Sequence, residues 1–439
     1  MKKRIIDLAA MSSGRAAQAI LSFVAVSILA RIMGPENLGV YSVVLASYYY
    51  CLHISEFGLR AIVIREWNRG AIKGIDFLSN YFLIRGAISC LICILSYFIC
   101  SVYFPEFIFL VPIIMASTIF NTFQVDWVLL VTERYLTSSW ILVIRPAAYC
   151  LLLSLLYYYS SLTLATLSIS FLCSWVLLTI GTWLVNKEVL IIKLSAISVK
   201  GITGLLKNGS PIFVVAIIGQ AIQSIDLLYI GSIYGAKKAG FYYLCSAIIV
   251  AATIFANSMS QITLGKMSNY VNNLTIFRQV LLADFKLMLI IATILSLFIV
   301  GVVRPLIPIL FGHEYTPSSL IILYFVPYFY IYHINSLLTS CYIVLNKQKE
   351  LLVLNIARIS LLLIGITLIA SNNGDIHLIA LLKGFIELIL SIYILACRQK
   401  EFFTGLLKFF TVPALVLLAF SIYLIFYVEF ESEMYVWLL

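Results

Sequence analysis

The chain is a succession of long apolar segments separated by short polar ones. An apolar segment of about 20 residues matches the ~30 Å hydrocarbon core of a bilayer when it is helical. Such segments lie at residues 12–33, 39–58, 78–101, 107–131, 138–159, 163–185, 209–233, 239–264, 284–303, 317–345, 351–370, 376–397 and 409–428. The pattern therefore predicts an all-α polytopic membrane protein with about 12–13 transmembrane helices.

One turn motif occurs twice, each time between two apolar segments. The pattern G-x-x-x-x-G-x-Y begins at Gly34 and again at Gly235, 201 positions later. Duplication at about half the chain length is typical of transporters built from parallel repeats. We therefore predict two six-helix lobes, residues 1–200 and 201–403, with 404–439 left for an extra transmembrane helix and a tail.

Composition and charge agree with a membrane protein and suggest its orientation. Hydrophobic residues make up 63% of the 439 positions and charged residues only 11%, against roughly 25% charged in a soluble domain. Most of the 29 Lys and Arg residues lie in the N-terminus and in alternate loops, such as 59–77 and 186–208. Because positive loops stay inside, the N-terminus is predicted to be cytoplasmic. The net charge of +10 is then a topology signal, and nucleic acid is not predicted as a partner.

Arginines within apolar segments are candidates for function, because a buried charge is costly unless it is partnered or faces water. Arg85, Arg145 and Arg358 each lie about seven residues, roughly 10 Å, from the cytoplasmic end of a predicted helix. Arg145 and Arg358 occupy corresponding helices in the two lobes. One arginine per lobe at equal depth predicts a cationic cavity, and the alternative is that the side chains snorkel to the headgroups.

Other polar residues form two stripes along predicted helices. A stripe can line a water-filled path or cross-link helices by hydrogen bonds, and the sequence leaves both open. The stripes consist of Gln220, Gln223 and Asp226 in the seventh helix and of Thr118, Thr122 and Asp126 in the fourth. Lys383 and Glu387, at i and i+4 of the twelfth helix, are expected to neutralise each other.

Several ordered motifs resemble one family of transporters. They are Leu29–Tyr41 at the first hairpin, Glu56–Leu59 followed by Ile64–Glu66, Ile225–Tyr242 around the second turn motif, and Leu310–Tyr315 before the tenth helix. As an ordered set they are similar to the bacterial polysaccharide exporters of the multidrug/oligosaccharidyl-lipid/polysaccharide exporter (MOP) superfamily, and within it to the O-antigen (Wzx-type) flippases.

The resemblance implies a function in lipopolysaccharide biosynthesis. It implies a protein of the bacterial inner membrane that moves undecaprenyl-diphosphate-linked oligosaccharide by alternating access between two lobes. A polysaccharide polymerase is then an expected partner, and proton or sodium coupling stays open. A cationic cavity fits a diphosphate substrate, since arginine binds phosphate through two parallel hydrogen bonds.

Three alternatives stay in view. A cation-coupled drug antiporter of the same fold would favour acidic cavity groups, and a lipid II flippase usually has more spans. A membrane-embedded polymerase, ligase or acyltransferase needs catalytic groups, for which His313-Glu314 in the outer loop is a weak candidate. The four histidines are scattered and no Walker motif occurs. The sequence therefore predicts a transporter that is not an enzyme, with no cofactor and no metal site.

Overall fold

The computed structural model describes residues 2–68, 75–132, 134–159, 163–186, 197–268, 270, 273–345, 347–395 and 423. Within these ranges the secondary structure is helical and contains no strand. The chain divides into two compact units, Met1–Gly231 and Ser232–Leu439, here called the first and the second unit. Each is described separately.

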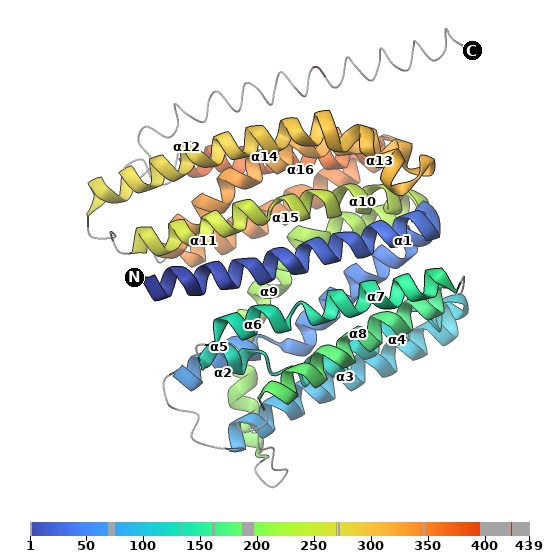
Figure 1. Cartoon of the computed structure of the whole chain (residues 1–439), viewed down its shortest axis with the longest axis vertical. Helices are drawn as coiled ribbons and strands as arrows, with labels where there is room; N and C mark the ends of the chain where they lie inside the picture. The colour runs from blue at the N-terminus through green and yellow to red at the C-terminus, as the bar shows by residue number, and fades with distance from the viewer. Residues whose placement is uncertain are drawn as a thin grey trace. The chain divides into compact units, whose positions relative to one another are not determined.

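The first unit begins with one long and one short helix and continues with a group of roughly parallel helices (Figure 1). Its helices are α1 (Lys2–Glu56), α2 (Leu59–Asn68), α3 (Ile75–Tyr103), α4 (Val111–Thr122), α5 (Trp127–Val131), α6 (Tyr135–Ile141), α7 (Ile144–Tyr158), α8 (Leu164–Val185) and most of α9 (Val199–Ile233). Helix α4 packs between α3 and α8, and α8 packs on α7, while α1 lies against α4, α6 and α7.

The second unit is built around one buried helix. Its helices are α10 (Ala236–Ala252), α11 (Ile254–Ser268), α12 (Leu274–Phe298), α13 (Arg304–Phe311), α14 (Thr316–Val344), α15 (Gln348–Ser371) and α16 (Ile376–Tyr393). Helix α14 contacts α10, α11, α12, α13, α15 and α16. The most apolar stretch of α14 is 72% buried, and that of α15 only 17%. Helix α14 is therefore the core of this unit and α15 is peripheral.

Eleven helical stretches in the described part of the chain are long and apolar enough to cross a membrane. The first, Ala16–Glu56, has 41 residues and covers most of the first two predicted spans. The other ten coincide with the third to twelfth predicted spans, so the all-α polytopic fold is confirmed. The thirteenth, 409–428, lies outside the described residues. The repeat of two six-helix lobes stays a prediction.

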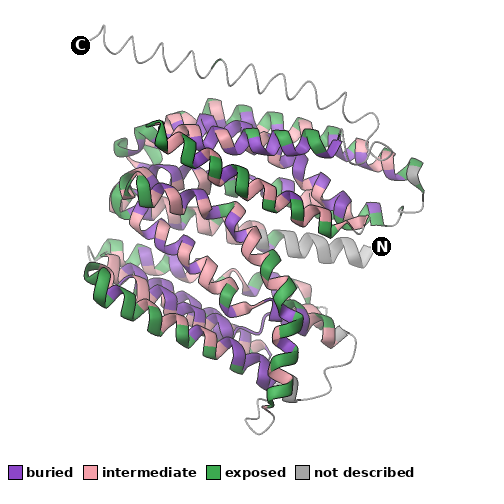
Figure 2. Cartoon of the chain, turned by 180° about the vertical axis from the view of Figure 1, so that it is seen from behind, coloured by how far each residue is buried: buried purple, intermediate pink, exposed green. Residues whose placement is uncertain are grey.

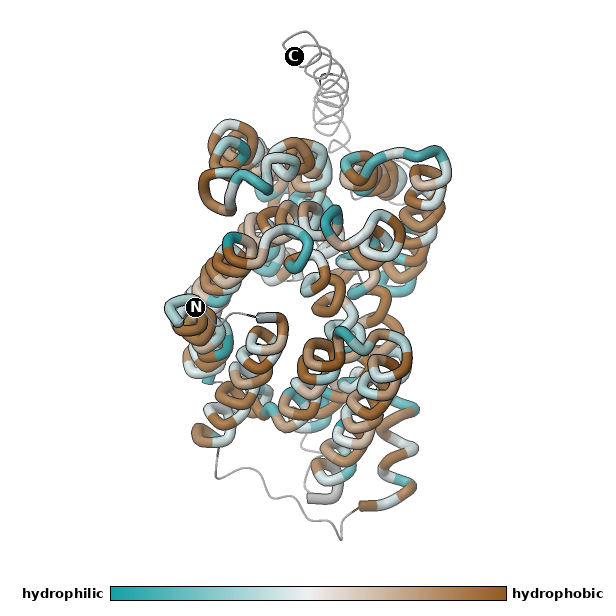
Figure 3. The backbone as a smooth tube through the Cα atoms, turned by 90° about the vertical axis from the view of Figure 1, so that its right-hand side faces the viewer, coloured by the Kyte–Doolittle hydropathy of each residue, from teal (hydrophilic) through white to brown (hydrophobic). Residues whose placement is uncertain are grey.

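Large apolar side chains face outward on many helices, as the lipid environment requires. On α3, for example, Leu91, Ile94, Phe98 and Val102 are all exposed and recur at helical spacing. Buried and exposed residues fall on different sides of the helices (Figure 2). Hydrophobic residues dominate the helical tube, and hydrophilic ones gather mainly at its turns (Figure 3). Soluble monomers rarely expose apolar stripes of this extent.

The two copies of the turn motif adopt the same rare backbone conformation. Gly34 has φ 70° and ψ 173°, and Gly235 has φ 85° and ψ 169°. Residues with a Cβ rarely adopt such a positive φ, so glycine is required at both positions. In each copy a helix ends before the glycine and a new one starts directly after it. The matched geometry supports the predicted repeat.

Two predicted spans are interrupted in the structure. The fourth span breaks between Thr122 and Trp127, so Asp126 lies at the N-cap of α5 and not in mid-helix as expected. The fifth breaks at Leu142–Val143. Pro146 explains the second break, because its ring clashes with the carbonyl four residues earlier, that of Leu142.

Candidate functional site

Arg358 points into the second unit. It falls on the stripe of α15 whose other members, Leu354, Leu362 and Ile366, are buried. The Arg358 side chain is only 18% exposed, and its Nε lies 2.9 Å from Oε1 of Glu387 on α16. Its Nη1 donates to Oδ1 of Asn355 at 3.0 Å. The side chain is therefore held inside the helix bundle by a carboxylate, which differs from a snorkelling anchor.

Glu387 is the centre of a buried polar cluster. Its side chain is 4% exposed, and its Oε2 accepts a hydrogen bond from Nδ2 of Asn335 on α14. The Ser391 hydroxyl donates to Oδ1 of Asn335. The chain of contacts thus joins α14, α15 and α16 at one level.

Lys383 lies one turn before Glu387 on α16 and is also buried. Its Nζ lies 5.2 Å from the ring centroid of Tyr328, a favourable cation–π distance. The sequence pointed to Lys383 as the partner of Glu387, whereas the structure pairs the carboxylate with Arg358. Spacing along one helix could not reveal this, since Arg358 lies on a neighbouring helix.

Arg145 has a different environment in the first unit. Its guanidinium carbon lies 4.9 Å from the ring centroid of Trp175 and 5.9 Å from that of Phe171, both on α8. Tyr48 of α1 packs edge-on against Phe171 at 5.2 Å. No acidic side chain among the described residues lies within ion-pair distance of Arg145. The Arg145 guanidinium contacts aromatic rings and no described carboxylate, so its N–H groups remain available to an anion.

Arg85 on α3 binds the C-terminal end of α4, where the fourth predicted span is interrupted. It is 2% exposed, and it donates to the Tyr81 hydroxyl at 2.5 Å and to Oδ1 of Asn121 at 2.8 Å. It also reaches the carbonyls of Asn121 and Thr122 at 3.3 and 3.4 Å. These are the last carbonyls of α4, which have no partner within the helix. A cation at a helix C-terminus is favourable, so Arg85 stabilises the end of α4.

Asp126 and the fourth-helix stripe also hold helices together. Asp126 is 1% exposed and lies 2.5 Å from Nη2 of Arg60 on α2. The hydroxyls of Thr122 and Ser89 are 2.9 Å apart, joining α4 to α3. Of the two functions left open for this stripe, the structure supports cross-linking. The Arg60 partner could not be seen in the sequence, because the two residues lie on separate elements.

The seventh-helix stripe does not form one continuous polar surface. Gln220 and Asp226 are buried on α9, whereas Gln223 is exposed. Gln220 donates to Ser224 of its own helix at 2.9 Å. The three side chains therefore do not face one shared cavity wall in this structure, and their function as cavity residues stays a prediction.

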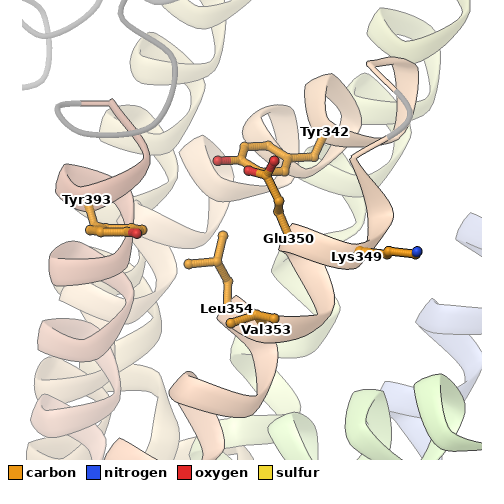
Figure 4. A pocket seen from close by; sticks show the side chains of 6 residues that line it. All are labelled: Tyr342, Lys349, Glu350, Val353, Leu354 and Tyr393. Carbon is orange, nitrogen blue, oxygen red and sulfur yellow. The ribbon is translucent and has the colours of Figure 1, made fainter.

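One pocket lies at the end of the second unit, between the C-terminal end of α14, the start of α15 and the end of α16. Its volume is about 180 Å³, and Tyr342, Lys349, Glu350, Val353, Leu354 and Tyr393 line it (Figure 4). Leu354 is also a member of the α15 stripe that carries Arg358. The pocket thus reaches to within one helical turn of the Arg358–Glu387 pair.

The guanidinium groups within the spans are the candidate side chains that are able to bind an anion. Of the three candidate arginines within the spans, Arg145 lies on aromatic rings, Arg358 faces a carboxylate, and Arg85 binds oxygen atoms at the end of α4. In the described part of the chain, no three His, Cys, Asp or Glu side chains come together as metal ligands.

Comparisons with known proteins identify the family and the fold. A sequence model of the family described as "Polysaccharide biosynthesis protein" matches residues 7–264. No curated protein sequence matches the chain.

Solved structures share the fold over almost the whole chain. The lipid II flippase MurJ in an inward closed conformation superposes with a TM-score of 0.75 at 15% identity, covering 96% of this chain and 99% of that one. An inward-facing multidrug resistance MATE transporter of the MOP superfamily superposes with a TM-score of 0.69 at 13% sequence identity. The match covers 92% of this chain and 95% of that one. A MOP superfamily transporter from Pyrococcus furiosus superposes with a TM-score of 0.61 at 14% sequence identity, covering 94% of this chain and 96% of that one. Its binding pocket is described as having reverse polarity.

Proposed function

Because the chain belongs to the polysaccharide biosynthesis protein family, we propose that it is a flippase for an undecaprenyl-diphosphate-linked oligosaccharide, an O-antigen or related repeat unit. It would move this lipid across the bacterial inner membrane by alternating access of two six-helix lobes. The N-terminus would be cytoplasmic, and a polysaccharide polymerase would receive the product.

Arg145 is the observation that carries this proposal. A diphosphate has two or more negative charges, and moving it through a low-dielectric region requires compensating charge. Arg145 supplies a cation at membrane depth whose neighbours are aromatic rings. Cation–π contacts hold the guanidinium in place while its N–H groups remain able to bind phosphate oxygens in pairs.

Arg358 supports the same function from the second unit. Its position in the chain corresponds to that of Arg145, and its side chain turns into the helix bundle. With the buried Lys383, the half-buried Arg358 gives this cluster two cations for one carboxylate, Glu387. An anionic substrate would balance the charge of the cluster.

Translocation in proteoliposomes tests the proposal directly. The purified full chain is reconstituted with a fluorescent undecaprenyl-diphosphate oligosaccharide, and exposure of the sugar on the opposite leaflet is measured with an impermeant lectin. We expect exposure to be faster than in empty liposomes. Matched liposomes containing a neutral lipid-linked oligosaccharide serve as control. Equal rates with and without the protein would contradict the proposal.

A cation-coupled drug antiporter of the same fold is the second candidate. The buried carboxylates Asp226 and Glu387 are the kind of group that binds cationic drugs. This function predicts that deletion raises drug sensitivity while O-antigen display stays intact. The flippase predicts the reverse pattern.

A further inference from the structure

We propose that Tyr48 and Trp175 complete, together with Arg145, one binding site for a phosphate group, in which a phenol hydroxyl and an indole N–H donate beside the guanidinium. The inference rests on the proposed function, because it names further binding residues for the anionic part of that substrate. It concerns the first unit alone.

The three side chains come together around Phe171. Phe171 and Trp175 lie at i and i+4 of α8, so they share one face of that helix. Arg145 of α7 lies 5.9 and 4.9 Å from the centroids of the two rings. The ring of Tyr48 on α1 lies 5.2 Å from that of Phe171 and 6.3 Å from that of Trp175. The Tyr48 hydroxyl also interacts electrostatically with Arg145. Three helices therefore bring these donors to one place.

Two of these donors are buried without a partner. Tyr48 is 0% exposed and Trp175 is 7% exposed. Neither the Tyr48 hydroxyl nor the Trp175 indole N–H has a hydrogen-bond partner among the described residues. Buried polar groups are almost always hydrogen-bonded, and an unpaired one destabilises the fold. A phenylalanine at either position would keep most of the apolar contact without this cost. The two donors therefore fit a ligand-binding function better than a structural one.

Other donors on the same helices do have partners. The indole N–H of Trp183 on α8 donates to the carbonyl of Phe123 at 2.7 Å. The hydroxyls of Tyr41 on α1 and Tyr149 on α7 lie 2.7 Å apart. The fold can thus pair a tyrosine hydroxyl and an indole N–H, whereas two such donors beside Arg145 stay unpaired.

The chemistry of the donors defines the ligand. A guanidinium and an indole N–H can only donate, and a tyrosine hydroxyl can donate as well. The ligand must therefore supply several acceptor atoms and a negative charge. A phosphate group supplies both, and hydrogen bonds to ionised groups are the strong ones. A neutral sugar hydroxyl would leave the charge of Arg145 uncompensated.

Neutral donors also suit a site that has to release its ligand. A further cation beside Arg145 would attract a diphosphate strongly in a low-dielectric region, and transport requires binding that is weak enough for the ligand to leave. The Tyr48 hydroxyl and the Trp175 N–H add hydrogen bonds and direction without adding charge. Arg145 thus supplies the attraction, and the two aromatic side chains fix where the phosphate oxygens lie.

Binding of inorganic pyrophosphate to the purified full chain tests the inference. Affinity is measured for the wild-type chain, Tyr48→Phe and Trp175→Phe. We expect each variant to bind pyrophosphate about tenfold more weakly, because each loses one hydrogen bond to a charged group. All other anion-binding groups of the chain are the same in these proteins, so the differences isolate the two donors.

The melting temperature without ligand separates ligand binding from a structural function. Tyr48→Phe removes a buried hydroxyl that has no described partner, so the ligand-free variant should be at least as stable as wild type. Tyr315→Phe is the matched control, since it also removes a buried hydroxyl without a described partner, in the second unit. It should keep the wild-type affinity for pyrophosphate.

Three results would overturn the inference. Wild-type affinity in either Tyr48→Phe or Trp175→Phe would show that the donor does not bind the anion. A ligand-free Tyr48→Phe protein that melts below wild type would show that the hydroxyl stabilises the fold. An equal loss of affinity in Tyr315→Phe would show that the effect does not depend on the surroundings of Arg145.

Competition and translocation separate this inference from the proposed function. A short-chain prenyl-diphosphate oligosaccharide should displace pyrophosphate, and less effectively in Tyr48→Phe. Pyrophosphate binding that depends on Tyr48 but resists this displacement would assign the site to a free phosphate anion and contradict the flippase. Lipid translocation at the wild-type rate by both Tyr48→Phe and Trp175→Phe would leave the flippase standing and contradict this site.

Discussion

Arg145 and Arg358 have matched positions in the sequence and different neighbours in the structure, aromatic rings for Arg145 and a carboxylate for Arg358. Their depth could be predicted from hydropathy alone, since it depends only on the distance to a helix end. Their partners could not, because Glu387, Phe171 and Trp175 come from neighbouring helices. The pairing of Asp126 with Arg60 could not be predicted for the same reason, because the two residues belong to different helices. Sequence spacing describes one helix at a time, whereas charge compensation is decided between helices.

Substitutions of Arg145 should distinguish the contribution of its charge to transport from that of its paired N–H donors. Arg145→Ala removes the cation and should reduce O-antigen display at least tenfold at normal protein level. Arg145→Lys keeps the charge without the paired donors and should be intermediate. Loss of the cation–π contacts costs only about 1 kcal/mol, so the protein should still fold. Display is measured by gel analysis of lipopolysaccharide, with Arg134→Ala as control. Full display by Arg145→Ala would show that this arginine does not contact substrate.

Asp375 lies outside the spans, at the N-cap of α16. The hydrogen bond with His377, followed by that with Lys238 at 2.7 Å, lowers the pKa of this carboxyl below its ordinary value of 3.8. A lowered pKa stabilises the fold above the unfolded-state pKa, and this stabilisation is lost only as the pH falls below it. Asp375→Asn should therefore lower the melting temperature at both pH 5 and pH 8. A difference that disappears at pH 5 would contradict the assignment.

At the scale of the element, glycines and prolines mark where the helices change direction or approach closely. Gly34 and Gly235 were predicted to lie in turns, and the structure shows two matched turns at these positions. A helix break precedes Pro146. The break before Asp126 was not expected, since residues 107–131 read as one apolar helix. At this break Arg85, from another helix, donates to the last carbonyls of α4.

Gly384 should be sensitive to substitution in a way that Gly219 is not. A Cβ at Gly384 would lie 2.8 Å from the backbone nitrogen of Tyr328 and 3.0 Å from Cβ of Pro327, whereas a Cβ at Gly219 would have no neighbour within 4 Å. Gly384→Ala should therefore separate α14 from α16 and lower the melting temperature by several degrees. Gly219→Ala should raise stability by about 1 kcal/mol, since alanine favours helix. Equal effects would contradict the close packing.

At the scale of the whole molecule, the fold was the most predictable feature. Segments of about 20 apolar residues permit few structures in a bilayer, because every backbone polar group must be satisfied within the segment. The family follows from residues 7–264 and the fold from structures that share only 13–15% of their residues. Recognition of the proposed sugar leaves no such pattern, because it depends on individual side chains that do not recur at a fixed spacing.

Membrane orientation can be tested by labelling single cysteines. Lys200→Cys lies in a loop predicted to be cytoplasmic and Lys237→Cys in a turn predicted to be outside. In intact cells an impermeant maleimide should label position 237 and not position 200, after subtraction of labelling in the parent protein. Permeabilised cells, in which both should react, provide the control. Labelling at position 200 in intact cells would reverse the orientation.

The pairing of Arg358 with Glu387 also bears on how the protein enters the membrane during synthesis. Helix α15 carries an arginine, and α16 carries a lysine and a glutamate. On insertion scales each charge near a helix centre costs about 3 kcal/mol, so α16 is a poor candidate for insertion by itself. The two helices are consecutive and pack together, joined by a short turn. They should leave the translocon as one hairpin whose opposite charges already meet, and truncation after α15 should leave that helix poorly inserted in a glycosylation-mapping assay.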